Sequence, residues 1–177
     1  MKTLKFKLLS AVIACTLLFS ACSKDSSSSS TPTGSTPSPY YVKCKINNVA
    51  YTFENAVALR TTVGSNEVLT IRATKSTSDT SDLVILQAIQ PAGSWSSPLT
   101  YFISNDGKEG TFSYRSKAGV QYSSANLPDM ESFNAVFTFI SYKKDEVVSG
   151  GFGGKVYSSS SSAAEFTEAT FNVKIGN

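Results

Sequence analysis

Carboxylates and aromatic rings are the side chains of this sequence that could carry chemistry. The chain has 177 residues and no histidine. That absence excludes Ser/His/Asp and Cys/His nucleophile pairs, histidine metal sites and His-ligated haem. The enzyme hypothesis that the sequence favours is a carboxylate-based hydrolase, which would use acidic residues such as Asp106 or Asp129. Paired carboxylates cleave glycosidic bonds, but no pattern in the sequence brings two of them together.

One acidic cluster could offer oxygen ligands to a cation. The segment Asn105–Gly110 reads Asn-Asp-Gly-Lys-Glu-Gly and supplies the carboxylates of Asp106 and Glu109. Oxygen ligands of this kind suit Ca²⁺. The alternating acidic residues that precede the glycine of an EF-hand loop are missing, however. A turn is the favoured interpretation, and we expect no cofactor.

Trp95 is the only tryptophan, and it lies in the turn-like segment Gly93–Pro98. An exposed aromatic ring there could stack on a sugar or anchor a protein partner, and the alternative is that it covers one end of the core. Tyr101 and Tyr122 could extend the same ligand-binding surface if they share a face with it. Tyrosines of strands are otherwise often half-buried.

The N-terminus has the pattern of a signal peptide. Lys2, Lys5 and Lys7 precede the apolar run Leu8–Phe19. This run is shorter than the roughly 20 residues that a membrane-spanning helix needs. Without these three lysines the chain has 13 cationic and 13 acidic side chains, so their charges balance. A balanced mature chain offers no basic patch to nucleic acid.

The segment Leu18-Phe19-Ser20-Ala21-Cys22 resembles the lipobox of bacterial lipoproteins. The resemblance implies that residues 1–21 are removed and that Cys22 carries a diacylglyceryl group, with acylation of its new amino group. An ordinary secretory signal cleaved after Ala21 is the alternative. In proteobacterial lipoproteins an Asp after the lipidated Cys retains the protein in the inner membrane, so Ser23 favours the outer membrane. The domain would face the periplasm or the cell exterior.

Residues 22–39 are expected to form a tether between the lipid and a single domain at residues 40–177. From Ser23 to Pro39 the chain holds eight Ser, three Thr, three Pro and one Gly, with no aliphatic or aromatic side chain. Such a segment cannot bury enough apolar surface to offset its chain entropy. The remaining 138 residues have the usual size of one domain with one core.

The domain is predicted to be all-β, an antiparallel sandwich or barrel of about 8–10 strands. Short runs rich in Val, Ile, Thr, Phe and Tyr alternate with turn residues, and no helical periodicity is sustained. The expected strands are Tyr41–Ile46, Val49–Phe53, Ala56–Thr62, Glu67–Thr74, Leu83–Ile89, Leu99–Ile103, Gly110–Arg115, Phe133–Tyr142, Val147–Tyr157 and Phe166–Ile175.

Apolar side chains predict which faces of these strands are buried. Cys44 alternates with charged neighbours, so we expect a small thiol in the core. Leu83–Leu86 and Phe133–Tyr142 are apolar at both parities, which predicts strands covered on both faces. Hairpin turns are expected at Asn47-Asn48 and at Val63–Asn66, and a longer loop at Lys117–Met130.

The domain is also similar to a group of small Bacteroidetes lipoproteins with β-rich domains. The likeness is carried by Cys44–Phe53, Pro91–Trp95, Val148–Phe152 and Ala169–Ile175. That group brings no established activity, so the resemblance implies fold and location only. The leading hypothesis is a membrane-anchored, non-enzymatic module that binds a glycan or a protein. A hydrolase and a structural component of the envelope are the alternatives.

Overall fold

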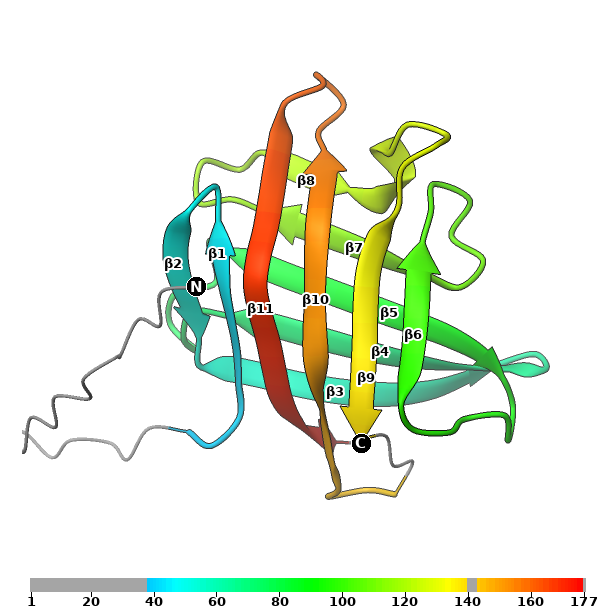
Figure 1. Ribbon diagram of the computed structural model, residues 1–177. Helices are drawn as coiled ribbons and strands as arrows, with labels where there is room; N and C mark the ends of the chain where they lie inside the picture. The colour runs from blue at the N-terminus through cyan, green and yellow to red at the C-terminus, as the bar shows by residue number, and fades with distance from the viewer. Residues whose placement is uncertain (1–37, 140–142, 177) are drawn as a thin grey trace, which may run out of the picture. The chain divides into compact units, whose positions relative to one another are not determined.

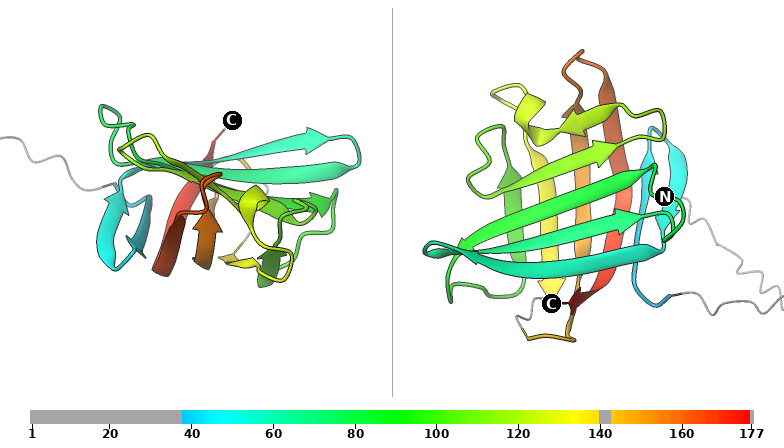
Figure 2. Two further views of the ribbon diagram at one scale, coloured as in Figure 1. Left: turned by 90° about the horizontal axis from the view of Figure 1, so that it is seen from above. Right: turned by 180° about the vertical axis from the view of Figure 1, so that it is seen from behind.

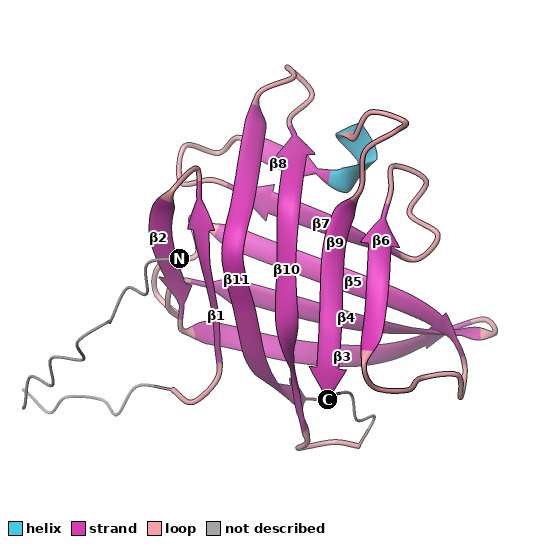
Figure 3. Cartoon of the chain, viewed as in Figure 1, coloured by secondary structure: helices cyan, strands magenta, loops and turns pink. Residues whose placement is uncertain are grey.

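The computed structural model describes residues 38–139 and 143–176, and their regular structure is almost entirely β-strand (Figure 1). The strands are β1 (Tyr41–Ile46), β2 (Val49–Phe53), β3 (Asn55–Val63), β4 (Asn66–Thr74), β5 (Leu83–Pro91), β6 (Leu99–Ile103), β7 (Gly110–Arg115), β8 (Gln121–Ser123), β9 (Phe133–Phe139), β10 (Val147–Tyr157) and β11 (Ala163–Gly176). A single 3-10 turn, η1 (Ser124–Asn126), follows β8 (Figure 3). The prediction of an all-β domain is confirmed.

The strands form two layers whose directions cross (Figures 1 and 2). One layer holds β2, β1, β11, β10, β9 and β6, and the other holds β3, β4, β5, β7 and β8. Two corners join the layers. At the first, β11 runs parallel to β3, with Ile175 opposite Ala58. At the second, Tyr157 of β10 lies opposite Ser123 of β8. Because β10 also pairs with β11, the hydrogen-bonded ladder encloses the core.

Local turn chemistry explains why the hairpins form where they do. Asn47 and Asn48 join β1 to β2 with φ of 50° and 66°. Positive φ at both central residues is the geometry that matches the twist of a two-residue hairpin, and Asn tolerates it. Gly64 joins β3 to β4 with φ of 61°. Both turns lie where the sequence predicts them.

Buried side chains alternate with less buried ones along much of each of the strands β1, β4, β5 and β7. Cys44 on β1 is buried as predicted, and burial raises the pKa of its thiol to about 12. The prediction that Leu83–Leu86 and Phe133–Tyr142 are covered on both faces is wrong. On β5, Val84 is buried while Ile85 is half-buried, and on β9 buried and exposed side chains alternate up to residue 138. Residues 140–142 lie outside the described residues.

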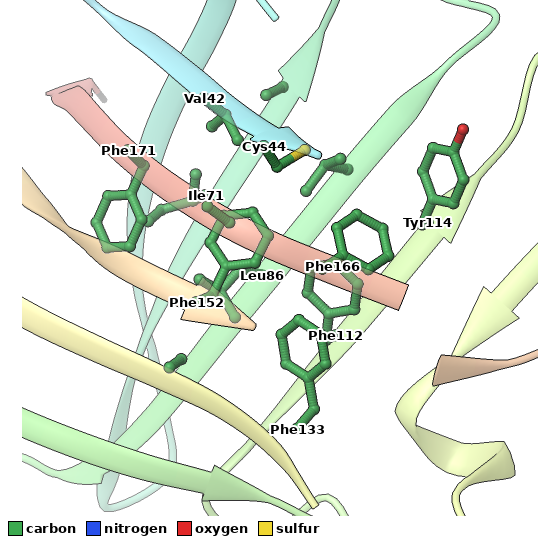
Figure 4. Close-up of a cluster of buried hydrophobic side chains, with 14 of the residues drawn as sticks. Val42, Cys44, Ile71, Leu86, Phe112, Tyr114, Phe133, Phe152, Phe166 and Phe171 are labelled. Atoms are coloured by element: carbon green, nitrogen blue, oxygen red, sulfur yellow. The ribbon is translucent and has the colours of Figure 1, made fainter. Parts of the chain in front are cut away.

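The space between the layers is filled by aromatic rings (Figure 4). Phe112 of β7 stacks on Phe133 of β9 with ring centroids 4.0 Å apart. Phe166 of β11 meets Phe112 edge-on at 4.9 Å. Phe152 of β10 completes the cluster. These four rings come from both layers, so their contacts fix how the layers pack.

The segment after β7 contains regular structure that the sequence does not predict. The expected long loop at Lys117–Met130 includes β8 and η1. Ser123 caps η1, because its side chain accepts a hydrogen bond from the backbone N–H of Ala125. Strand β8 has three residues, so it is too short for an alternating pattern to show.

Candidate functional site

The inner face of the layer formed by β3, β4 and β5 becomes polar at one end. On β4, Glu67 follows the parity of Leu69 and Ile71, which are buried. On β3, Arg60 follows the parity of Ala58. Glu67 is 7 % exposed, and its carboxylate accepts a hydrogen bond from the Arg60 guanidinium at 2.6 Å. A buried carboxylate requires a partner of this kind.

The loop that connects β5 to β6, residues 92–98, crosses this polar end. Its first residue, Ala92, donates its backbone N–H to the carbonyl of Ser65 at 2.9 Å. Near its other end, the Ser97 hydroxyl donates to the carbonyl of Thr138 on β9. The loop is therefore fastened both to the turn between β3 and β4 and to the opposite layer. Trp95 lies between these two fastenings.

Arg60, Glu67, Gly93 and Trp95 line a groove of about 240 Å³. Trp95 is half-buried, so part of its indole remains open to solvent. The groove thus combines an aromatic ring with a guanidinium and a carboxylate whose charges cancel. An aromatic surface beside paired donors and acceptors suits a neutral, hydroxyl-rich ligand, because rings stack on the apolar face of such a ligand and the polar groups bond its hydroxyls.

Tyr101 lies next to Trp95 but not on the surface. The two ring centroids are 6.2 Å apart, and Tyr101 is 1 % exposed. The prediction that it extends an exposed binding surface is therefore wrong. Burial raises the pKa of Tyr101 to about 12, and the nearby Gln90 carboxamide opposes that rise. Among the described residues its buried hydroxyl has no hydrogen-bond partner of normal geometry. Tyr101 supports Trp95 from the core.

Tyr122 lies on β8 and is not among the residues that line the groove. Its ring stacks on Tyr114 of β7 with centroids 5.7 Å apart. The structure thus brings Tyr101 to Trp95 and places Tyr122 elsewhere. Of the three aromatic residues expected to bind a ligand, Trp95 is the one that borders a groove.

The acidic cluster at Asp106 and Glu109 is organised as a turn. The Asp106 carboxylate accepts hydrogen bonds from the Ser104 hydroxyl at 2.6 Å and from the backbone N–H of Lys108 at 3.1 Å. The Lys108 ammonium lies 2.8 Å from the same carboxylate and, with these hydrogen bonds, holds the pKa of Asp106 well below its usual range. Glu109 accepts the backbone N–H of Phe102 at 3.1 Å. Within the described part of the chain, no group of three His, Cys, Asp or Glu residues could hold a metal ion.

The other candidate for a hydrolytic carboxylate also makes a local contact. Asp129 is exposed and accepts a hydrogen bond from the Asn105 carboxamide at 3.0 Å. Neither Asp129 nor Asp106 lines the groove beside Trp95. Glu67 is the one carboxylate that does, and the Arg60 guanidinium binds it.

Comparison with known proteins finds no matching family, no similar curated protein and no similar solved structure. None of the described residues belongs to a helix with the length and apolar character to cross a membrane.

The sequence contains a signal for Arg60 and Glu67. Both residues occupy positions of inward parity on strands that the sequence predicts, two residues from an apolar inward neighbour. A charged residue at an inward position is a departure from the alternating pattern, and opposite charges on neighbouring strands can compensate each other. Their pairing across β3 and β4 follows from the hairpin, whose turn sets Thr62 opposite Glu67.

Proposed function

We propose that this chain is a lipid-anchored binding protein of the outer membrane that holds a neutral saccharide in the groove of Arg60, Glu67, Gly93 and Trp95. The observation that carries the proposal is the convergence of the half-buried Trp95 on the Arg60–Glu67 pair. The lipobox at Cys22 and the polar tether at residues 22–39 support the anchored location.

The chemistry of the groove favours a neutral ligand over an ionic one. Arg60 already contacts a carboxylate at 2.6 Å, so an anionic ligand would have to compete with Glu67. A saccharide hydroxyl can instead accept from the guanidinium and donate to the carboxylate without separating them. The face of a pyranose ring carries C–H groups, which pack on an indole. A groove of about 240 Å³ suits one terminal sugar residue better than a long chain.

Binding is favoured over hydrolysis by the number of carboxylates. Glycoside hydrolysis by the usual route needs two carboxyl groups, placed about 5 to 10 Å apart across the scissile bond. The groove contains one, and that one is held in an ion pair. A carboxylate in an ion pair is held in its ionised form. It can therefore accept a hydrogen bond from a ligand, but it has no proton to donate as a general acid.

The single tryptophan makes the test direct, because excitation at the red edge of the protein absorption band selects the indole of Trp95 over the eight tyrosines. Titration of the full chain with a panel of neutral mono- and oligosaccharides should give a saturable change in emission for at least one sugar. Calorimetry of Trp95→Ala should then show the loss of that binding. Phe102→Ala is the matched control, because Phe102 is an aromatic residue with 59 % exposure that does not line the groove.

Two results would count against the proposal: no saccharide changes the emission of Trp95, or Trp95→Ala binds as tightly as the parent chain. The location has its own test. Cys22→Ser should move the chain from the membrane fraction to the soluble fraction, and continued membrane association of this variant would exclude lipid at Cys22 as the anchor.

A further inference from the structure

A second pocket, of about 220 Å³, lies on the outer face of the layer formed by β3, β4 and β5. Strands β3 and β4 and the loop of residues 75–82 border it. It is lined by Asn55, Val57, Arg72, Thr74 and Thr80. This pocket is separate from the saccharide groove, because Arg72 takes the outward parity of β4 whereas Glu67 takes the inward one.

Arg72 is a cation that has no partner among the described residues. Within residues 38–139 and 143–176 its guanidinium makes no ion pair and no hydrogen bond, whereas Arg60 contacts Glu67 and Arg115 donates to a backbone carbonyl. The residues opposite Arg72 on the neighbouring strands are Val57 and Ile85, which have no polar side-chain atoms. All five N–H donors of Arg72 are therefore available to a ligand.

Two other polar groups of the pocket, on Asn55 and Thr80, each have a donor left for a ligand. The Asn55 carboxamide gives one N–H to the Thr74 hydroxyl at 2.9 Å and retains a second. The Thr74 hydroxyl passes its proton to the carbonyl of Ser76 at 2.9 Å. The Thr80 hydroxyl has no partner among the described residues and can donate. No carboxylate lines the pocket.

The nearest acidic residue of the loop is engaged elsewhere. Asp79 accepts hydrogen bonds from the hydroxyl and the backbone N–H of Ser81, and these bonds lower its pKa. Lys75 and Lys117 lie close enough to add to that effect. The negative charge of Asp79 is thus partly balanced before a ligand arrives.

The loop that supplies Thr80 is held in place before any ligand binds. The carbonyl of Thr80 accepts a hydrogen bond from the Arg115 guanidinium at 2.9 Å. Two residues further on, Asp82 is buried and accepts the Tyr114 hydroxyl at 2.9 Å. A pocket whose walls are already fixed loses little conformational entropy when it binds.

We propose that the pocket of Asn55, Arg72 and Thr80 binds a tetrahedral oxyanion, a phosphate or sulfate group carried by a small molecule or by a lipid headgroup. Its donors come from three different segments, β3, β4 and the loop of residues 75–82. A tetrahedral group presents oxygens in several directions and can meet all three, while a planar carboxylate presents two oxygens in one plane. Charge-assisted bonds from guanidinium supply the affinity.

The test is a titration of the full chain followed by amide and guanidinium NMR, at constant ionic strength set with chloride. Inorganic phosphate, sulfate and acetate are the first three ligands. We expect saturable shifts at Arg72, Asn55 and Thr80 with phosphate or sulfate and weaker binding of acetate. Arg72→Gln should lower the affinity by roughly tenfold or more, because it removes the charged hydrogen bonds.

Two further variants make the result specific. Lys155→Gln removes one exposed positive charge from β10. It should leave the affinity unchanged within about twofold, because Lys155 does not line the pocket and salt screens exposed charges. Thr80→Val removes a hydroxyl from the loop without a change of charge and should weaken binding, which gives a second measurement if Arg72→Gln alters the fold.

The source of the anion is decided by a fourth ligand, glycerophosphoglycerol, the soluble headgroup of phosphatidylglycerol. Tighter binding of this diester than of inorganic phosphate would assign the pocket to a lipid headgroup, and the reverse would assign it to a free phosphate or sulfate group. The proposal is overturned if no oxyanion gives a saturable shift, or if Arg72→Gln and Lys155→Gln lose the same affinity. Neither result would contradict the proposal of saccharide binding, because Trp95 fluorescence measures that site separately.

Discussion

Replacement of Asp82 by alanine should destabilise the domain more than the loss of any exposed acid. Asp82 is 2 % exposed and lies where the loop after β4 enters β5. Its carboxylate accepts the Tyr114 hydroxyl at 2.9 Å and the backbone N–H of Lys117 at 2.8 Å. The Lys75 ammonium lies 3.5 Å away. One side chain therefore connects the loop before β5 to the segment after β7.

The magnitude follows from what Asp82→Ala leaves behind. The Tyr114 hydroxyl, in a residue 3 % exposed, loses its acceptor, and an unsatisfied buried donor costs about 1 to 3 kcal/mol. The N–H of Lys117 loses its acceptor too, although water can reach that end of the loop. The cost of burying the Asp82 charge is recovered at the same time. We expect a net loss of about 2 to 4 kcal/mol, which is a large share of the roughly 5 to 15 kcal/mol that holds an ordinary domain together.

The assay is equilibrium unfolding in urea, with an unchanged m-value as the sign that both chains unfold between the same states. Tyr114→Phe removes the donor and leaves Asp82 its other two partners, so it should cost about 1 kcal/mol. Asp129→Ala is the matched control, because Asp129 is exposed and should change stability by no more than about 0.5 kcal/mol. If Asp82→Ala and Asp129→Ala cost the same, the carboxylate does not hold these segments together.

Three further outcomes are expected. The Cys44 thiol, whose pKa burial raises to about 12, should react with an aromatic disulfide reagent at pH 8 only after unfolding. Because the unfolded thiol ionises near its ordinary pKa of 9.0, stability should fall as pH rises from there towards 12. Gly110→Ala should lower the free energy of unfolding in urea by about 3 kcal/mol or more, because its Cβ would lie 2.1 Å from a backbone oxygen of β5. Gly64→Ala is the control: its Cβ meets no atom within 4 Å, so it should cost only the roughly 1 to 2 kcal/mol of a positive φ. The double variant Arg60→Met with Glu67→Leu should have a urea midpoint of unfolding equal to or above that of the parent chain. The same variant should show no saccharide binding in calorimetry.

The strands were largely predictable because the sequence alternates with a period of two and interrupts that alternation with turn residues. β1 and β2 begin and end at the predicted residues, since Asn47 and Asn48 are suited to positive φ and charged residues alternate with apolar ones. Burial was harder to predict. Ile85 is apolar and yet only half-buried, because it faces outward and neighbouring strands, not a further layer, cover it.

The groove was predictable in part. The type of Trp95 and its turn-like setting make it a candidate, but the sequence does not show which residues it approaches. That depends on the path of residues 92–98, which is fixed by hydrogen bonds to Ser65 and Thr138, residues distant along the chain. The burial of Tyr101 is hard to predict for a related reason. Its inward parity on β6 is visible in the sequence, but only the packing of β6 against β9 shows that the ring is covered.

The Arg60–Glu67 pair argues for a binding role on energetic grounds. The Glu67 side chain is only 10 % exposed, whereas the Arg60 side chain is 37 % exposed. Removing the Glu67 carboxylate from water has a desolvation cost, which its contact with Arg60 offsets. Stability alone would favour aliphatic residues at these inward positions, as at Leu69 and Ile71 further along β4. The pair sits instead where the core opens into a groove beside Trp95, where its donor and its acceptor can reach a ligand. A buried carboxylate that carries a desolvation cost, and that lies in such a groove, is best explained by recognition.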